Sequence, residues 1–151
     1  MGDPAAMVSG AVRDMDAADG CGVVSVSRLY RTEPVGYEDQ GWFVNACVEV
    51  STSLAPRELL ALARSLEEAA GRERGGIKDG PRPLDVDILF YGGLVMDEPG
   101  LCIPHPRAHK RRFVLAPLCD IAPHLRHPLL GKTARELLAE TRDRKQVIPC
   151  S

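Results

Sequence analysis

The sequence lacks the features that mark several large classes of protein. None of its apolar runs approaches the ~20 residues that a membrane-spanning helix needs, so we expect no membrane partner. The first ten residues, MGDPAAMVSG, lack the basic region and apolar stretch of a secretory leader, which favours a cytoplasmic location. The five cysteines are odd in number, widely spaced and without a CxxC pair. This pattern argues against a disulfide framework and against a zinc ribbon.

The sequence also lacks the excess of positive charge that is usual in nucleic-acid-binding proteins. It has 19 basic and 21 acidic residues and a net charge of −2. The basic residues gather instead in two clusters, which are Arg72, Arg74, Lys78 and Arg82, and then Arg107, Lys110, Arg111 and Arg112. Two local clusters in a slightly acidic chain indicate a small anionic ligand, and for any one of these residues a solvated surface loop is the alternative. An RNA-binding module is disfavoured further, because an aromatic-rich sheet motif is lacking as well.

The length and composition that remain are those of one ordinary globular domain, residues 1–151. With 44% apolar and 26% charged residues, a chain of this size can bury about 68% of its unfolded surface. Periodicity predicts helices at about 4–16, 56–70, 113–121 and 133–142, and strands at about 23–30, 42–52, 84–91, 94–97 and 101–103. Because the links between strands are short, we expect antiparallel pairing in an α+β sandwich.

Local signals set several of these bounds. Asp3 followed by proline is a good start for the first helix, and Thr133 with Glu136 forms a capping box for the last one. Gly71 stands where a glycine commonly ends a helix. The Gly-Lys-Thr stretch that ends at Thr133 is not a phosphate-binding P-loop, because Arg126 stands where that motif needs its earlier glycine.

The most informative segment is GPRPLDVDILF at residues 80–90. Side chains alternate along a strand, so Asp85 and Asp87 point the same way, about 6.6 Å apart. Two carboxylates inside an apolar strand are costly unless they are compensated, and two magnesium ions shared with phosphate oxygens would compensate them. Arg82 is close enough in sequence to reach the same phosphate. Two solvated aspartates on an exposed strand face are the alternative.

A few other side chains suit a phosphate and a heterocycle. His105 stands between two prolines, six residues before Arg111, and could donate to phosphate, with a backbone-bonded loop histidine as the alternative. Asn45 lies in an apolar strand, and its amide offers both donors and acceptors to the edge of a ring. Phe43 and Phe113 are aromatic platforms or, more commonly for this residue type, parts of the core.

Together these segments resemble the 6-hydroxymethyl-7,8-dihydropterin pyrophosphokinase family of folate biosynthesis. The matching stretches occur in the family's order over residues 29–138. They are LYRTEPVG (29–36), WFVNACVEV (42–50), LEEAAGRERGG (66–76), GPRPLDVDILFYGG (80–93) and IPHPRAHKRRFVLAPLCDIAP (103–123). The pairing of GPRPLDVDILF with PHPRAHKRRFVLAPL is highly specific to this family.

The resemblance implies a ferredoxin-like sandwich that moves pyrophosphate from ATP to the hydroxymethyl group of the pterin and releases AMP. The implied site has metal ligands Asp85 and Asp87 for two Mg²⁺ ions, ATP ligands Arg82, His105 and Arg111, catalytic loop arginines Arg72 and Arg82, and pterin contacts Thr32, Val35, Phe43, Asn45 and Phe113. The implied partners are the two small substrates alone, with the protein a monomer.

The sequence departs from the family pattern at Asp79, at Glu33, which replaces a commonly apolar residue, and at its start. Asp79 stands in the loop where members often have tryptophan or asparagine, and its charge opposes closure over a triphosphate. Family members begin with a strand that precedes the first helix, whereas here the helix signal starts at Asp3. We therefore expect a shortened, marginally stable sheet with an open edge. A non-catalytic remnant that still binds nucleotide or pterin is the alternative to the enzyme.

Overall fold

The computed structural model describes residues 3–33, 42–73 and 83–150. Within these ranges, helices combine with antiparallel strand pairs, which confirms the α+β class. The elements in chain order are α1 (Pro4–Ala17), β1 (Cys21–Val26), β2 (Tyr30–Thr32), β3 (Phe43–Asn45), β4 (Val48–Thr52), α2 (Pro56–Glu73), β5 (Met96–Glu98), β6 (Leu101–Ile103), η1 (Ala108–Lys110), α3 (Arg112–Ile121), α4 (Ala134–Glu140) and β7 (Val147–Pro149).

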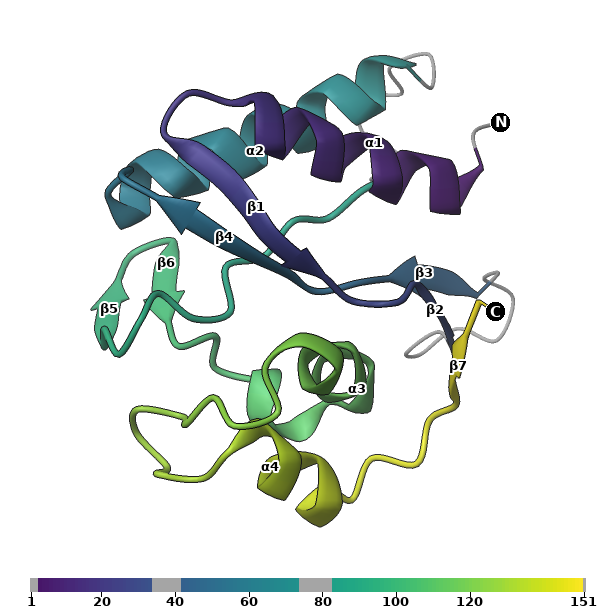
Figure 1. Cartoon of the computed structure of the whole chain (residues 1–151), viewed down its shortest axis with the longest axis vertical. Helices are drawn as coiled ribbons and strands as arrows, with labels where there is room; N and C mark the ends of the chain where they lie inside the picture. Colours follow the sequence, from purple (N-terminus) through teal and green to yellow (C-terminus); the bar gives the residue numbers. More distant parts are fainter. Residues whose placement is uncertain (1–2, 34–41, 74–82, 151) are drawn as a thin grey trace.

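The helices form two layers with the strands between them (Figure 1). Helices α1 and α2 pack together on one side of the β1–β4 pair, and α3 and α4 pack together on the opposite side. Strand β2 pairs with β3 on one edge and with β7, near the C-terminus, on the other. Strands β5 and β6 form a separate antiparallel pair. Among the described residues, no helix is long and apolar enough to cross a membrane.

The capping signals placed two helices well. Asp3 caps α1 by accepting a hydrogen bond from the Ala5 N–H, and Thr133 and Glu136 form both bonds of the capping box of α4. The helix end at Gly71 is wrong, because α2 continues to Glu73. A glycine inside a helix costs only about 1 kcal/mol relative to alanine, and the strong helix formers around Gly71 offset that cost.

The two predicted long strands, 23–30 and 42–52, are each broken in two. The break lies at Ser27, whose N–H donates to the Cys47 carbonyl and whose hydroxyl oxygen accepts the Cys47 N–H at 2.8 Å. Beyond it, Tyr30 pairs with Asn45, one residue out of register with the pairing of β1 and β4. On both sides of the break the strands pair antiparallel, β1 with β4 and β2 with β3. The two pairs belong to separate sheets.

The segment 84–91 was expected to be a strand, and that expectation is wrong, because no ladder pairing is assigned to it within the described ranges. Its side chains nevertheless alternate as in a strand. Leu84 is buried and Val86 is partly buried, whereas Asp85 and Asp87 are exposed. Over residues 84–87 the burial therefore alternates as the sequence predicts, without a neighbouring strand on the described part of the chain.

The best-packed part of the core lies between α3, α4 and the strand break. Leu115 and Leu118 of α3 meet Ala134 and Leu137 of α4, and Cys47 closes the cluster from the strand side. The other layer is looser, since α1 has no buried residue although its apolar side chains face inward. All five cysteines are free thiols.

Candidate functional site

One cavity of about 1680 Å³ separates the two helical layers. Its walls come from α1 and α2 on one side, from α3 on the other, and from the strands and segment 84–91. Seven of the residues singled out in the sequence lie in this lining, namely Thr32, Phe43, Asn45, Asp85, Asp87, Arg111 and Phe113. The fold therefore brings together side chains from three distant parts of the chain.

The paired strands β2 and β3 supply the part of the wall suited to a flat, polar ring. Thr32 is 1% exposed, and its hydroxyl oxygen accepts a hydrogen bond from the Asn45 amide nitrogen at 2.6 Å. This bond fixes the orientation of the amide. Phe43, directly opposite Thr32 in the ladder, is 48% exposed. A phenyl ring left so open is not a core residue, so that alternative is wrong for Phe43.

The second aromatic ring comes from the beginning of α3. Phe113 lies in the first turn of the helix, and the Arg111 guanidinium lies over its ring at 5.5 Å from the centroid. Cation–π contact of this kind holds an arginine in place while leaving its donors free for an anion. Arg112 has a different task, because its backbone N–H donates to Asp143 and its guanidinium donates to the Lys145 carbonyl. Of the second basic cluster, Arg111 therefore faces the cavity, whereas Arg112 binds the C-terminal segment.

His105 lies outside the described cavity lining but is electrostatically coupled to it. Burial lowers the pKa of His105 below its ordinary value, and Arg111 and Arg107 lower it further against the opposing effect of Asp87. The ring is therefore neutral at pH 7. Its Nδ1 atom accepts a hydrogen bond from the Arg107 N–H at 3.1 Å, so the single ring proton belongs to Nε2. His105 can donate that proton to a phosphate oxygen in a hydrogen bond.

The two carboxylates are the candidate metal ligands. Asp85 and Asp87 lie on the same side of the extended segment, and both are exposed. In the described part of the chain, no group of three or more acidic, histidine or cysteine side chains gathers at one point. A cation held here would take its remaining oxygen ligands from a bound phosphate and from water. That donor set is typical of Mg²⁺, which uses one or two carboxylates and keeps several waters.

Three of the expected site residues are not placed by the structure. Two of them, Val35 and Arg82, lie outside the described residues. Asp79, the departure from the family pattern, lies outside them too. The backbone of Arg72 belongs to the last turn of α2, but its side chain is not described. The loop arginines expected to approach the phosphates therefore remain predictions.

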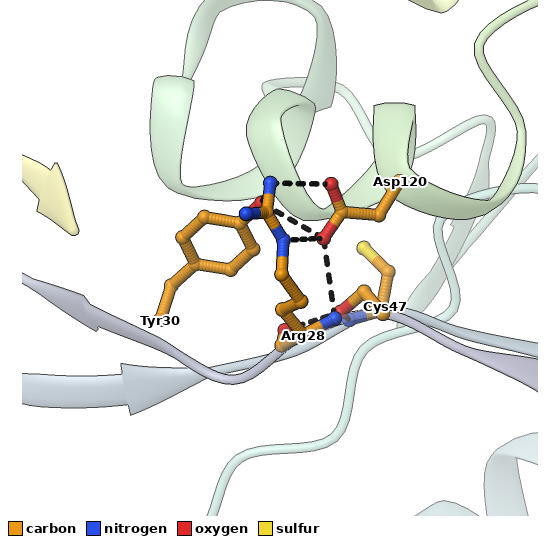
Figure 2. A network of polar contacts seen from close by, with 5 residues as sticks. Arg28, Tyr30, Cys47 and Asp120 are labelled. Carbon is orange, nitrogen blue, oxygen red and sulfur yellow. Dashed lines mark hydrogen bonds and ion pairs between the residues drawn. The ribbon is translucent and has the colours of Figure 1, made fainter. Parts of the chain in front are cut away.

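One carboxylate that no sequence pattern indicated, Asp120, connects α3 to the strands. Figure 2 shows Arg28 and Tyr30, from the strand side, reaching Asp120 on α3. Asp120 accepts bonds from the Tyr30 hydroxyl at 2.8 Å and from the Arg28 N–H, Nε and Nη2 at 3.1 Å. Burial alone would raise the pKa of Asp120, but these bonds hold it below its ordinary value. The network joins α3, which carries Phe113, to β2, which carries Thr32.

Comparison with known proteins shows the family of the chain. A profile of the 7,8-dihydro-6-hydroxymethylpterin-pyrophosphokinase family matches residues 1–123. The chain is 45% identical over 140 residues to the 2-amino-4-hydroxy-6-hydroxymethyldihydropteridine pyrophosphokinase of Methylorubrum extorquens, covering 93% of this chain and 87% of that protein. For the pyrophosphokinase of the same name from Pseudomonas aeruginosa, the identity is 45% over 117 residues, covering 78% and 71%.

A plant relative is longer. The folate synthesis bifunctional protein of Arabidopsis thaliana is 49% identical over 102 residues, which is 68% of this chain and 21% of that protein. The family profile spans most of the chain, and two bacterial relatives match it over most of their own length. The chain belongs to the 7,8-dihydro-6-hydroxymethylpterin-pyrophosphokinase family.

Proposed function

We propose that this chain is an ATP-dependent diphosphotransferase of folate biosynthesis. It transfers pyrophosphate from ATP to the hydroxymethyl group of 6-hydroxymethyl-7,8-dihydropterin and releases AMP. The observation that carries the proposal is one cavity whose lining includes two aromatic rings, a hydrogen-bonded amide, two carboxylates and an arginine. The family membership supports the same reaction.

The reaction is a displacement at phosphorus. The hydroxymethyl oxygen bonds to the β-phosphorus and releases its proton to solvent. The bond from the β-phosphorus to the oxygen that bridges it to the α-phosphorus breaks, and that oxygen leaves with AMP. Phosphoryl-type transfer needs positioning and charge neutralisation more than covalent help from the protein. Arg111 and the Nε2–H of His105 are the described donors that we assign to the triphosphate. We assign Arg82 to the same role and Arg72 to closure over the phosphates.

The pterin binds between the rings of Phe43 and Phe113. Stacking suits both rings, since one is half exposed and the other lines the cavity at the start of α3. The Asn45 amide, held by Thr32, meets the hydrogen-bonding edge of the heterocycle. We add Val35 to this pocket from the sequence alone.

Asp85 and Asp87 hold Mg²⁺, with two ions as the proposed number. Their carboxylates are exposed on one side of the segment, and hard oxygen ligands of this kind suit the cation. When bound, Mg²⁺ supplies charge neutralisation to the triphosphate and orientation to the attacking hydroxyl. The carboxylates themselves fix where that charge is placed in the cavity.

For the fold, we propose a single ferredoxin-like domain, a cytoplasmic monomer, in which the sheet has room for one further strand. Strand β4 has one ladder neighbour among the described strands, and segment 84–91 has none. Residues of both line one part of the cavity, next to the part that we assign to the substrates, although protein interiors are normally close-packed. An apolar fluorescent dye should therefore bind the native chain. Failure of the dye to bind would contradict an open position in the sheet.

The test of the function is AMP formation from ATP, Mg²⁺ and the pterin, measured by a coupled assay. Asp87→Ala should abolish turnover while the circular dichroism spectrum is unchanged. Asp97→Ala is the matched control, because Asp97 is equally exposed but belongs to β5, outside the cavity lining. Unchanged AMP release from Asp87→Ala would overturn the metal assignment. Binding of ATP or pterin by the unaltered chain without AMP formation would instead identify a non-catalytic binder.

A further inference from the structure

An ion pair on α2, between the buried Glu67 and the half-exposed Arg64, binds the backbone between the two site carboxylates. The Glu67 residue is 7% exposed, and its Oε2 atom accepts the Val86 N–H at 2.7 Å. The same oxygen accepts a bond from Arg64 Nη1 at 2.8 Å, and that Nη1 also donates to the Val86 carbonyl at 3.3 Å. One carboxylate and one guanidinium, three residues apart on a helix, thus engage both polar groups of a single peptide residue.

Val86 is the residue between Asp85 and Asp87. Because side chains alternate along an extended backbone, fixing the N–H and C=O of Val86 sets the direction and the spacing of both neighbouring carboxylates. We propose that Glu67 and Arg64 are positioning residues that hold the two aspartates in the geometry required to bind metal and triphosphate. This inference rests on the proposed function, in which Asp85 and Asp87 bind Mg²⁺.

Glu67 and Arg64 make the backbone hydrogen bonds to Val86 that a neighbouring strand would make in a sheet. Segment 84–91 has no assigned ladder within the described ranges, so the carboxylate of Glu67 satisfies the Val86 N–H in place of a neighbouring strand. A buried carboxylate is costly unless it is paired and hydrogen-bonded. Glu67 meets both conditions, and the side chain of Arg64 is about half exposed.

The far end of the segment is also fixed. The His105 backbone N–H donates to the Leu89 carbonyl at 2.9 Å, and the Tyr91 hydroxyl donates to the Leu54 carbonyl. The segment that carries the aspartates is therefore bonded to α2 at Val86 and to the His105 backbone at Leu89. We assign the His105 side chain to the triphosphate. A shift of Val86 would move the carboxylates relative to that histidine.

The inference is tested by the Mg²⁺ dependence of turnover and, independently of turnover, by Mn²⁺ binding. Glu67→Ala should raise the half-saturating Mg²⁺ concentration about 10–100-fold, the usual effect of losing a residue that orients metal ligands. Glu67→Gln keeps an oxygen for the Val86 N–H and should lose less than Glu67→Ala. The KM for pterin should change less than twofold in both. Mn²⁺ affinity, measured by electron paramagnetic resonance with a non-hydrolysable ATP analogue, should fall in parallel.

The matched control is Ser65→Ala, because the Ser65 hydroxyl bonds only within α2, to the Leu62 carbonyl, in the described structure. It should leave metal dependence unchanged. If Glu67→Ala does not fold, Arg64→Met supplies the test, since it removes the bond to the Val86 carbonyl and keeps the aliphatic stem. Lower thermal stability with unchanged metal dependence in these variants would overturn the inference. Absence of AMP formation by the unaltered chain would overturn the proposed function instead.

Discussion

Replacing Asp120 by alanine tests how the site is held together. The substitution removes the acceptor for the Tyr30 hydroxyl, at 2.8 Å, and for the backbone and side chain of Arg28. Tyr30 is 3% exposed, so its hydroxyl proton is left in a place where water has little access. The Arg28 guanidinium is largely exposed and recovers its lost bonds from solvent, so it adds little.

The expected cost is therefore mainly that of one bond between a buried hydroxyl and a carboxylate. A hydrogen bond to a charged group contributes about 1.5–3 kcal/mol, and an unsatisfied buried donor costs a similar amount. We expect Asp120→Ala to lower the free energy of unfolding by about 2–3 kcal/mol. For a domain of this size, that corresponds to a fall in Tm of about 4–12 °C.

Urea unfolding of Asp120→Ala, Tyr30→Phe and the double variant measures the coupling directly. Because Tyr30→Phe removes the other partner of the same bond, the double variant should cost clearly less than the sum of the single ones. Asp120→Asn is the control, since it keeps an oxygen for the Tyr30 hydroxyl and should lose less than half as much. Additive losses, with a coupling below about 0.5 kcal/mol, would refute the reasoning.

The charge of Asp120 gives the same prediction a pH dependence. Its pKa is lower in the folded protein than in the unfolded chain, so the folded state binds fewer protons around that pKa. The stabilisation is therefore complete above the unfolded value of about 3.9 and is lost as the pH falls through the folded pKa. The stability difference between the unaltered chain and Asp120→Asn should shrink in that range. A difference independent of pH would contradict the charged network.

Three further changes test other parts of the account. Leu115→Ala, at a position 1% exposed in the core, should cost about 2–5 kcal/mol in urea unfolding, and a loss below 1 kcal/mol would contradict the packing. Burial lowers the pKa of His127, whose Nδ1 accepts the Leu129 and Leu130 N–H groups, so stability should fall as the pH drops below about 6.5. His127→Asn keeps an acceptor and should lack that loss, and identical pH profiles would refute the assignment. Phe43→Ala should raise the KM for pterin about tenfold, as loss of a stacking ring does, while leaving the KM for ATP nearly unchanged. Equal changes in both values would argue against a pterin platform.

The features that the sequence predicted well depend on neighbouring residues. The cap at Asp3 and the capping box at Thr133 involve partners within three residues, so local pattern determined α1 and the start of α4. The break at Ser27 could not be seen, because it depends on hydrogen bonds to Cys47, twenty residues away. Strand β7, which pairs with β2, was missed for the same reason.

The candidate site divides in a similar way. Polar residues inside apolar stretches, such as Asp85, Asp87 and Asn45, could be predicted from the sequence pattern, and all three line one cavity. Asp120 and Glu67 could not, because an acidic residue on a helix is normally a solvated surface residue. Their partners Tyr30 and Val86 are 90 and 19 residues away in the chain, and only the tertiary structure brings them together.

The most direct test of the central claim is to follow the β-phosphorus of ATP. ATP labelled at that position is incubated with the chain, Mg²⁺ and 6-hydroxymethyl-7,8-dihydropterin, and the products are separated. If the chain transfers pyrophosphate, the label appears in the pterin diphosphate, with one AMP formed for each pterin consumed. Label recovered in ADP, or a pterin left unlabelled while ATP is bound, would contradict the claim.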